Sequence, residues 1–143
     1  MKSIQTILFL AVFLVVGIGA SAQTPVERVS MIKLIAQPEQ YHAKRVMVSG
    51  YLHIRFEGNV LYLTKEDALN KNGKSGLWIG YDKKVTSRED LKDYDGYYAK
   101  LKPYSEKFVW IEGTFDKNET GHLDCCAAGL VGVSDVLVIR RSN

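Results

Sequence analysis

Hydrophobic and polar positions beyond residue 22 first follow the period of an α-helix. Val29, Ile32 and Ala36 fall on one helical face. The segment 24–27 reads TPVE, which is typical of a helix start because it combines a capping Thr, a Pro in the first turn and a Glu that can complete a capping box. Pro38 disfavours helical backbone in the residue before it. We therefore predict an N-terminal helix that begins at residue 24 and ends before Pro38.

Alternating apolar and polar residues then predict three strands. The first runs from Val46 to Phe56, and a turn at Gly58-Asn59 separates it from a short second strand over residues 60–63. The polar segment 65–75 is interpreted as a loop with room for one helical turn. The third strand is expected over Leu77–Tyr81.

The second half of the chain begins with another helical pattern. Ser87 starts it with a capping sequence, and Pro103 ends it. Its apolar face is formed by residues at helical spacing, namely Leu91, Tyr94, Tyr98 and Leu101. A fourth strand follows over Phe108–Phe115. The apolar segments 123–130 and 133–139 predict either one long or two short final strands.

An internal repeat indicates how these strands assemble. Segments 44–52 and 107–115 share the pattern K-x-V-x-[VI]-x-G-x-[LF], with Gly50 and Gly113 at equivalent positions. Glycine inside a strand marks a bulge or bend, as a small coiled barrel requires. Three strands, a helix and two strands is also the order of the OB-fold. We predict a mainly β (α+β) fold, a five-stranded OB-like Greek-key barrel with an N-terminal helix and a helix between strands 3 and 4.

Short motifs distributed along the chain after residue 22 support the same fold. They are Leu34-Ile35-Ala36-x-Pro38, Tyr41 with Lys44-x-Val46, Leu61-Tyr62-Leu63 with Glu66-Asp67, Glu112-Gly113-Thr114-Phe115, and Gly121-His122. With these motifs the chain resembles a group of small exported bacterial OB-like proteins of unknown function. The resemblance implies an exported barrel, and it carries over neither catalytic residues nor a cofactor.

The first 22 residues have the organisation of a secretory signal peptide. Lys2 precedes an uninterrupted apolar run, Ile7–Val16, and Ala20-Ser21-Ala22 provides the small-x-small cleavage pattern. A membrane-spanning helix needs about 20 apolar residues, whereas Ile7 to Ala20 supplies 14. We therefore expect residues 1–22 to be a signal peptide and residues 23–143 to be one barrel domain, exported to the periplasm or the medium without a membrane anchor.

Composition narrows the function classes. The chain has 143 residues, of which 46% are hydrophobic and 24% are charged, and its net charge is only +3. This hydrophobic fraction excludes a disordered protein, and the small net charge disfavours a nucleic-acid partner. His42, His53 and His122 are scattered and accompany no recognisable nucleophile motif. We therefore expect no catalytic residue, although an enzyme with an unrecognised site remains an alternative.

Aromatic residues give the clearest candidate binding surface. OB barrels bind extended ligands on the face of their second and third strands, where aromatic rings can stack on sugars or bases. The candidates on these strands and the adjoining first strand are Tyr51, His53, Arg55, Tyr62, Trp78 and Tyr81. We interpret the chain as a non-catalytic binding module for an oligosaccharide, a peptide or an envelope protein, with no cofactor.

The alternative is a small metal-binding or redox protein. On a strand, His122, Asp124 and Cys126 would share one face, and zinc or copper accepts these ligand types. The same alternation sends Cys125 to the opposite face, and three groups on one strand supply only part of a tetrahedral shell. We therefore expect no bound metal.

The signal-peptide interpretation predicts the start of the exported protein. Its intact mass is expected to correspond to a chain that begins at Gln23, because signal peptidase cuts after the small-x-small pattern. A membrane-bound product that retains Met1 would contradict this interpretation.

Overall fold

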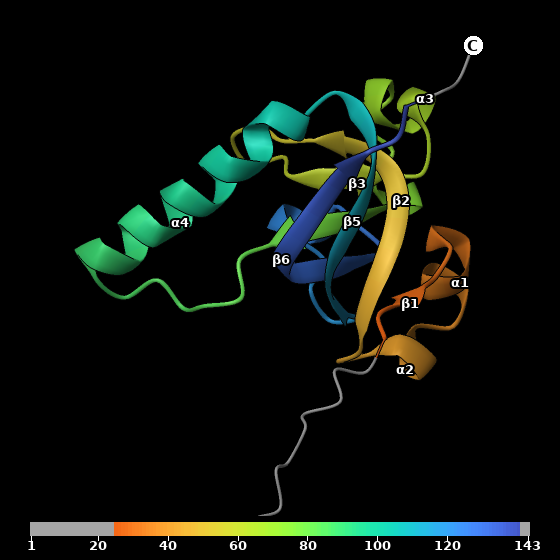
Figure 1. The fold of residues 1–143 in the computed structure, drawn as a ribbon, viewed down its shortest axis with the longest axis horizontal. Coiled ribbons are helices and arrows are strands. Elements are labelled where there is room, and N and C mark those ends of the chain that lie inside the picture. The colour runs from red at the N-terminus through yellow and green to blue at the C-terminus, as the bar shows by residue number, and fades with distance from the viewer. Residues whose placement is uncertain (1–24, 141–143) are drawn as a thin grey trace, which may run out of the picture.

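The computed structural model describes residues 25–140 (Figure 1). The predicted signal peptide, residues 1–22, and its cleavage position lie outside the described residues. Within residues 25–140, none of the helices has both the length and the hydropathy needed to span a bilayer.

Five strands form a closed barrel, as predicted, within a mixed α/β structure (Figure 1). Neighbouring strands follow the order β2-β3-β4-β6-β5, and β5 closes the barrel by pairing with β2. Within the barrel, all pairs are antiparallel except β4 and β6, which are parallel. The barrel strands are β2 (Arg45–His53), β3 (Val60–Tyr62), β4 (Gly76–Gly80), β5 (Lys107–Asp116) and β6 (Ala128–Val138).

The two copies of the internal repeat lie side by side where the barrel closes. Val46 pairs with Gly113 and Gly50 pairs with Val109, so each glycine faces a valine of the other copy. A Cβ at Gly50 would lie 2.6 Å from the carbonyl oxygen of Tyr62. A Cβ at Gly113 would lie 2.8 Å from Cγ of Leu130. The glycines therefore allow neighbouring strands to approach closely at the points where β2 and β5 coil.

The N-terminal helix differs from the prediction in its start and its buried face. Glu27–Arg28 forms strand β1, which pairs in parallel with β2. Helix α1 (Met31–Ala36) begins only after Ser30, whose hydroxyl caps the amide of Lys33. The predicted start at residue 24 is therefore wrong, because long-range backbone pairing places residues 27–28 in a sheet. Ile32, assigned to the buried face, is 64% exposed.

Pro38 both ends one helix and begins the next. It occupies the first turn of α2 (Pro38–Tyr41), where its missing amide hydrogen costs nothing. Tyr41 from α2 joins Met31 and Leu34 from α1 in the core at one end of the barrel. These two short helices cover β2 on the side of β1 (Figure 1).

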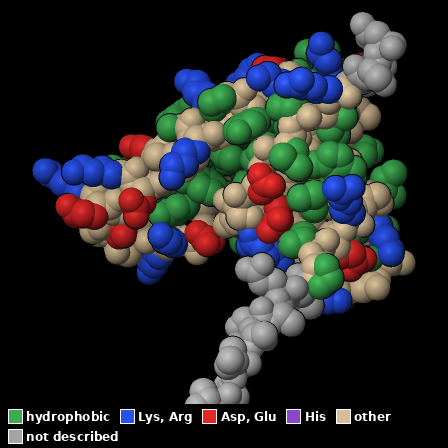
Figure 2. All heavy atoms as spheres, viewed as in Figure 1, with side chains coloured by type: hydrophobic (Ala, Val, Ile, Leu, Met, Phe, Trp, Pro, Cys, Tyr) green, Lys and Arg blue, Asp and Glu red, His purple; other side chains and the backbone are tan. Residues whose placement is uncertain are grey.

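Two further helices position the cavities described below. Helix α3 (Lys65–Leu69) follows β3 and is capped by Thr64. Helix α4 (Arg88–Leu101) connects β4 to β5 in the chain, and Ser87 and Asp90 form a reciprocal capping box at its start. The first turns of α4 project away from the barrel (Figure 1). Charged side chains of both signs crowd this projecting end (Figure 2).

The segment between β5 and β6 is a turn in place of the predicted strand. Residues His122–Asp124 form a 3₁₀ turn, in which Leu123 and Asp124 have φ of 56° and 53°. Strand β6 begins only at Ala128 and continues to Val138, with an irregular register opposite Glu112 and Thr114. The prediction of a strand from Leu123 is therefore wrong for residues 123–127.

Close packing at the barrel glycines gives a stability prediction. Gly50→Ala and Gly113→Ala are each expected to lower the free energy of unfolding by about 1–3 kcal/mol, because the added methyl group has no space unless a strand shifts. Gly96→Ala is the control, since no heavy atom lies within 4 Å of the added Cβ. In α4 it should raise the stability by about 0.5–1 kcal/mol. Unchanged urea midpoints for both barrel variants would contradict the close-approach explanation.

Candidate functional site

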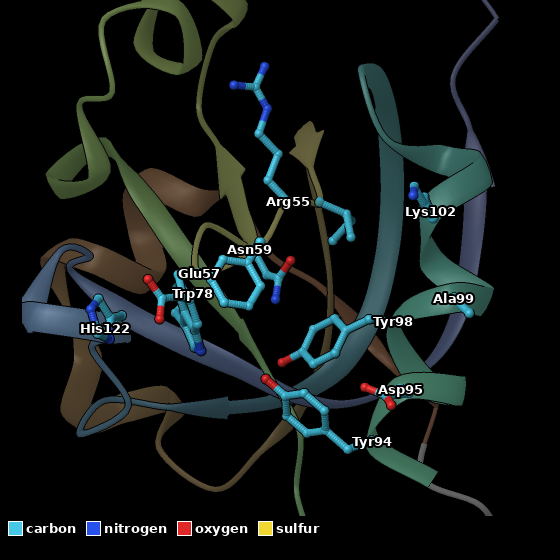
Figure 3. Close-up of a pocket in the computed structure, with 12 residues that line it drawn as sticks. Arg55, Glu57, Asn59, Trp78, Tyr94, Asp95, Tyr98, Ala99, Lys102 and His122 are labelled. Carbon is cyan, nitrogen blue, oxygen red and sulfur yellow. The ribbon is translucent and has the colours of Figure 1, made fainter. Parts of the chain in front are cut away.

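A cavity of about 630 Å³ lies between the barrel and the C-terminal half of α4, and we call it the α4 cavity (Figure 3). Four parts of the chain meet there: the β2–β3 connection, strand β4, α4 with the turn that follows it, and the β5–β6 connection, which supplies His122. Its lining residues are Ile54, Arg55, Phe56, Glu57, Asn59, Trp78, Tyr94, Asp95, Tyr98, Ala99, Lys102 and His122.

Three aromatic side chains form the walls of the α4 cavity. Trp78 extends from β4, and Tyr94 and Tyr98 extend from successive turns of α4 towards it (Figure 3). The two tyrosine rings meet edge to face with centroids 4.9 Å apart. The Tyr98 hydroxyl donates a hydrogen bond of 2.9 Å to the carbonyl of Ile79, which fixes α4 against β4. Burial, with Tyr94 and Tyr97 nearby, raises the pKa of Tyr98 far above its usual value of 10.0, so its hydroxyl stays neutral.

Asn59 supplies a buried polar group between these aromatic residues. Its side chain points into the α4 cavity near Trp78 and Tyr98 (Figure 3). The residue is only 5% exposed, and its Oδ1 accepts no hydrogen bond from residues 25–140. The backbone of Asn59 is fixed, because its carbonyl accepts a bond of 2.8 Å from the Ile79 amide. An unsatisfied buried acceptor costs about 1–3 kcal/mol, so Oδ1 would gain from any ligand hydroxyl or amide that reaches it.

The rim of the α4 cavity is polar, with one exposed aromatic side chain. Arg55 and Lys102 provide positive charge, and Glu57 and Asp95 provide negative charge. Phe56 is 93% exposed at the tip of the β2–β3 connection. The site therefore favours a neutral ligand with polar substituents over one of high net charge.

A second cavity of about 630 Å³ lies on the other side of the β2–β3 connection, beside α3, and we call it the α3 cavity. It shares Arg55, Phe56 and Glu57 with the α4 cavity. Its other lining residues are Tyr51, His53, Gly58, Val60, Tyr62, Ala68, Leu69, Lys71, Gly73, Glu106 and Cys125.

Glu106 organises the polar side of the α3 cavity. Its Oε1 lies 2.6 Å from Nδ1 of His53, and its Oε2 accepts a hydrogen bond of 2.9 Å from the Tyr51 hydroxyl. The backbone of Glu106 has φ of 62°, and its amide donates to the carbonyl of Leu52. Positive φ is costly for a side chain of this size. The residue with this strained backbone is the one whose carboxylate contacts His53.

The pKa of Glu106 reflects two opposing effects. Partial burial raises the pKa, but the hydrogen bond from Tyr51 and the neighbouring His53 and Arg55 lower it more. The pKa therefore lies below the usual 4.5, and the carboxylate is ionised at neutral pH. The ionised carboxylate lies 2.6 Å from Nδ1 of His53 and so holds the orientation of this ring.

The structure divides the predicted binding residues between the two cavities. Four of them line the α3 cavity, namely Tyr51, His53, Arg55 and Tyr62. Arg55 and Trp78 line the α4 cavity. Tyr81 lines neither, because its ring packs against Tyr94 and Tyr97 with centroid distances of 5.6 and 5.3 Å. Their role in binding stays a prediction.

Sequence reasoning missed several residues of these cavities. Asn59 was interpreted only as part of a turn, and Tyr94 and Tyr98 only as the apolar face of a helix. The tyrosines carried a usable signal, because hydroxyl-bearing rings four residues apart on a helix suit a half-buried wall better than a closed core. Glu106, after the helix-ending Pro103, gave no comparable signal.

The predicted arrangement of His122, Asp124 and Cys126 on one strand face is wrong, because this segment is a turn. His122 lines the α4 cavity, whereas Cys126 is fully buried. The predicted separation of the two cysteines is also wrong, since their Sγ atoms lie 3.0 Å apart. Within residues 25–140, no three His, Cys, Asp or Glu side chains are grouped as a metal site requires.

Comparison with known proteins adds no assignment to this geometry. The sequence matches no protein-family model, and none of the curated proteins searched is similar to it. The function is therefore inferred from the two cavities.

The lowered pKa of Glu106 gives a pH prediction. The folded protein holds the Glu106 proton less tightly than the unfolded chain, so this group stabilises the fold above pH 4.5 and ceases to do so as the pH falls through its lowered pKa. Glu106→Gln is expected to lower the free energy of unfolding at pH 7, and the difference from wild type should shrink below pH 4. Glu57→Gln, on an exposed loop carboxylate, is the control. A difference that is constant from pH 7 to pH 3 in urea titrations would contradict the assignment.

Proposed function

We propose that this chain is an exported, non-catalytic binding module with an OB-like Greek-key barrel. Counted from β2, the five barrel strands follow the order 1-2-3-5-4 before closing on strand 1, and the third and fifth strands are parallel. Helix α4 lies between the third and fourth barrel strands in the chain. In OB-folds the ligand lies on strands 2 and 3 and on the loops that join strands 1–2 and 4–5. The α4 cavity takes Trp78 from the third barrel strand and further lining residues from both of these connections, and α4 supplies the opposite wall.

The observation that carries the proposal is the combination of Trp78, Tyr94 and Tyr98 around the free acceptor of Asn59. Aromatic faces bind the apolar faces of flat rings without requiring charge, and they lose little conformational entropy on binding. Asn59 Oδ1 then fixes the orientation of the ligand by accepting one hydrogen bond. Apolar walls with a few convergent polar groups are typical of small-ligand sites.

An oligosaccharide fits this cavity better than a peptide or an envelope protein does. A sugar ring offers a face that stacks on Trp78 and hydroxyl groups that donate to Asn59 Oδ1 and bond to the rim. The rim charges of both signs also suit a neutral, hydroxyl-rich ligand.

An envelope protein or peptide is the second candidate, and a different observation favours it. Phe56 and Leu123 are 93% and 87% exposed on the two connections at this end of the barrel. Exposed aromatic and aliphatic side chains at loop tips are typical anchors for a protein partner. Such a partner would cover the loop tips, whereas a sugar would enter the α4 cavity.

The binding proposal predicts separable effects of two tryptophan substitutions. Against a panel of bacterial and plant oligosaccharides, Trp78→Ala is expected to weaken binding at least about tenfold, since one stacked ring contributes about 1–3 kcal/mol. Trp110→Ala is the matched control, because Trp110 lies on β5 beneath the guanidinium of Arg28 and outside both cavities. Calorimetric titration measures the affinity.

Three outcomes would oppose the proposal. Equal binding by wild type and Trp78→Ala would remove the α4 cavity as the site, and turnover of a bound sugar would make the protein an enzyme. One equivalent of zinc or copper, lost in His122→Ala or Cys126→Ser, would favour the metal-binding alternative.

A further inference from the structure

We propose that Cys125 and Cys126 form a redox-active vicinal dithiol that exchanges with a small-molecule disulfide entering the α3 cavity. Their Sγ atoms lie 3.0 Å apart, and both thiols are free. A disulfide bond of about 2.0 Å requires the sulfurs to approach by only about 1 Å. Cys125 lines the α3 cavity and not the α4 cavity, so the proposal does not need an oligosaccharide ligand.

The turn that precedes β6 brings the two thiols together. The amide of Cys126 donates a bond of 2.9 Å to the carbonyl of Thr120, which folds residues 120–126 back on themselves. The Lys74 ammonium donates to the carbonyls of Asp124 and Cys126 at 2.6 and 3.2 Å. Gly73 lies so close that a Cβ there would be 2.3 Å from the carbonyl oxygen of Cys125. The pair is thus held by a segment about fifty residues earlier in the chain.

The two cysteines differ in access, which assigns them different roles. Cys125 is half-buried and lines the α3 cavity, so it is the cysteine of the pair that faces a dissolved reagent. Cys126 is fully buried beneath it, next to Tyr62 and Val60. Burial raises the pKa of Cys126 well above its usual value, which suppresses direct attack by this thiol. Cys125 is therefore the attacking thiol and Cys126 the resolving thiol.

The exchange balances as two successive displacements. The Cys125 thiolate attacks one sulfur of a disulfide RSSR, forms a mixed disulfide Cys125–S–S–R, and releases RS⁻, which takes up the proton that Cys125 lost. The Cys126 thiol then loses its proton, attacks Cys125 Sγ and expels the second RS⁻, which is protonated in turn. Overall, two protein thiols and RSSR give one vicinal disulfide and two RSH, so the protein is oxidised by two electrons and RSSR is reduced.

Adjacency in the chain makes such a disulfide labile. Consecutive Cα atoms across a trans peptide are about 3.8 Å apart, closer than the roughly 4.4–6.8 Å of ordinary disulfides. A strained disulfide is more easily reduced, as catalytic and regulatory pairs require. The pair therefore suits reversible exchange and does not suit a permanent covalent link.

Oxidation of the two cysteines would also change the surroundings of the Trp78 ring, because the same turn contacts it. The backbone of Gly121 lies flat on the indole, since a Cβ at Gly121 would be 2.4 Å from Cδ2 of Trp78. Residues 121–125 form one continuous turn, so rotation of the cysteine side chains into a disulfide moves the group that covers this ring. Trp78 fluorescence therefore reports the state of the thiols.

The test uses the purified protein with Trp110→Phe, which leaves Trp78 as the sole tryptophan. Oxidised glutathione is added under denaturant-free conditions, and the products are identified by intact mass and thiol titration. We expect loss of both thiols and of two hydrogen atoms, no retained glutathione, a change in Trp78 emission, and full reversal by reduced glutathione. Monomer mass distinguishes the internal bond from a disulfide-linked dimer.

Two single variants test the assigned roles. Cys126→Ser is expected to retain one glutathione on Cys125, because the resolving thiol is missing, whereas Cys125→Ser should remain unmodified. Equal glutathionylation of both variants would overturn the order of attack. The protein with both cysteines tests the proposal without the variants. A stable glutathione adduct, the formation of disulfide-linked dimers alone, or thiols that do not react would each overturn it. None of these outcomes decides whether the reduced protein binds an oligosaccharide, which is measured separately with Trp78→Ala.

Discussion

Barrel closure between β2 and β5 is the constraint on which the rest of this structure depends. The two strands pair over eight residue positions, and each inserts a glycine opposite a valine of the other. Without side chains at Gly50 and Gly113, the neighbouring strands β3 and β6 come within contact distance of the β2–β5 pair. The β2–β3 connection leaves the barrel next to this closure and lies between the two cavities, both of which it lines.

The two cavities differ in what holds their walls. The α3 cavity is built on the barrel itself, with Glu106 fixed by a strained backbone and by Tyr51. The α4 cavity has one rigid wall, which carries Trp78 and Asn59, and one helical wall. Tyr97 and Tyr98 attach that helix by hydrogen bonds to the carbonyls of Gly80 and Ile79. Polar attachment at the end of β4 thus adds to the apolar packing of Leu101, Tyr97 and Tyr98 against the core.

Local patterns predicted the barrel because alternation and glycine placement are properties of the strands themselves. The predictions were wrong where the secondary structure depends on pairing with a distant strand or on a backbone with positive φ. Residues 27–28 join a sheet through β2, and Leu123 adopts positive φ within an apolar segment that otherwise resembles a strand. For the site, Trp78 was predictable as an aromatic residue on the third strand. Asn59 was not, because its importance comes from burial beside Tyr98, and the packing angle of α4 determines that burial.

The attachment of α4 has a consequence for selectivity. Its first turns project beyond the barrel and are closed by their own capping box, so the helix does not depend on the barrel at that end (Figure 1). The turns that line the α4 cavity, by contrast, are held against β4 by Tyr97 and Tyr98, so these two hydrogen bonds set the width of the cavity. For the proposed ligand, both walls would then select girth, and the projecting turns would leave room for a chain that extends beyond the cavity.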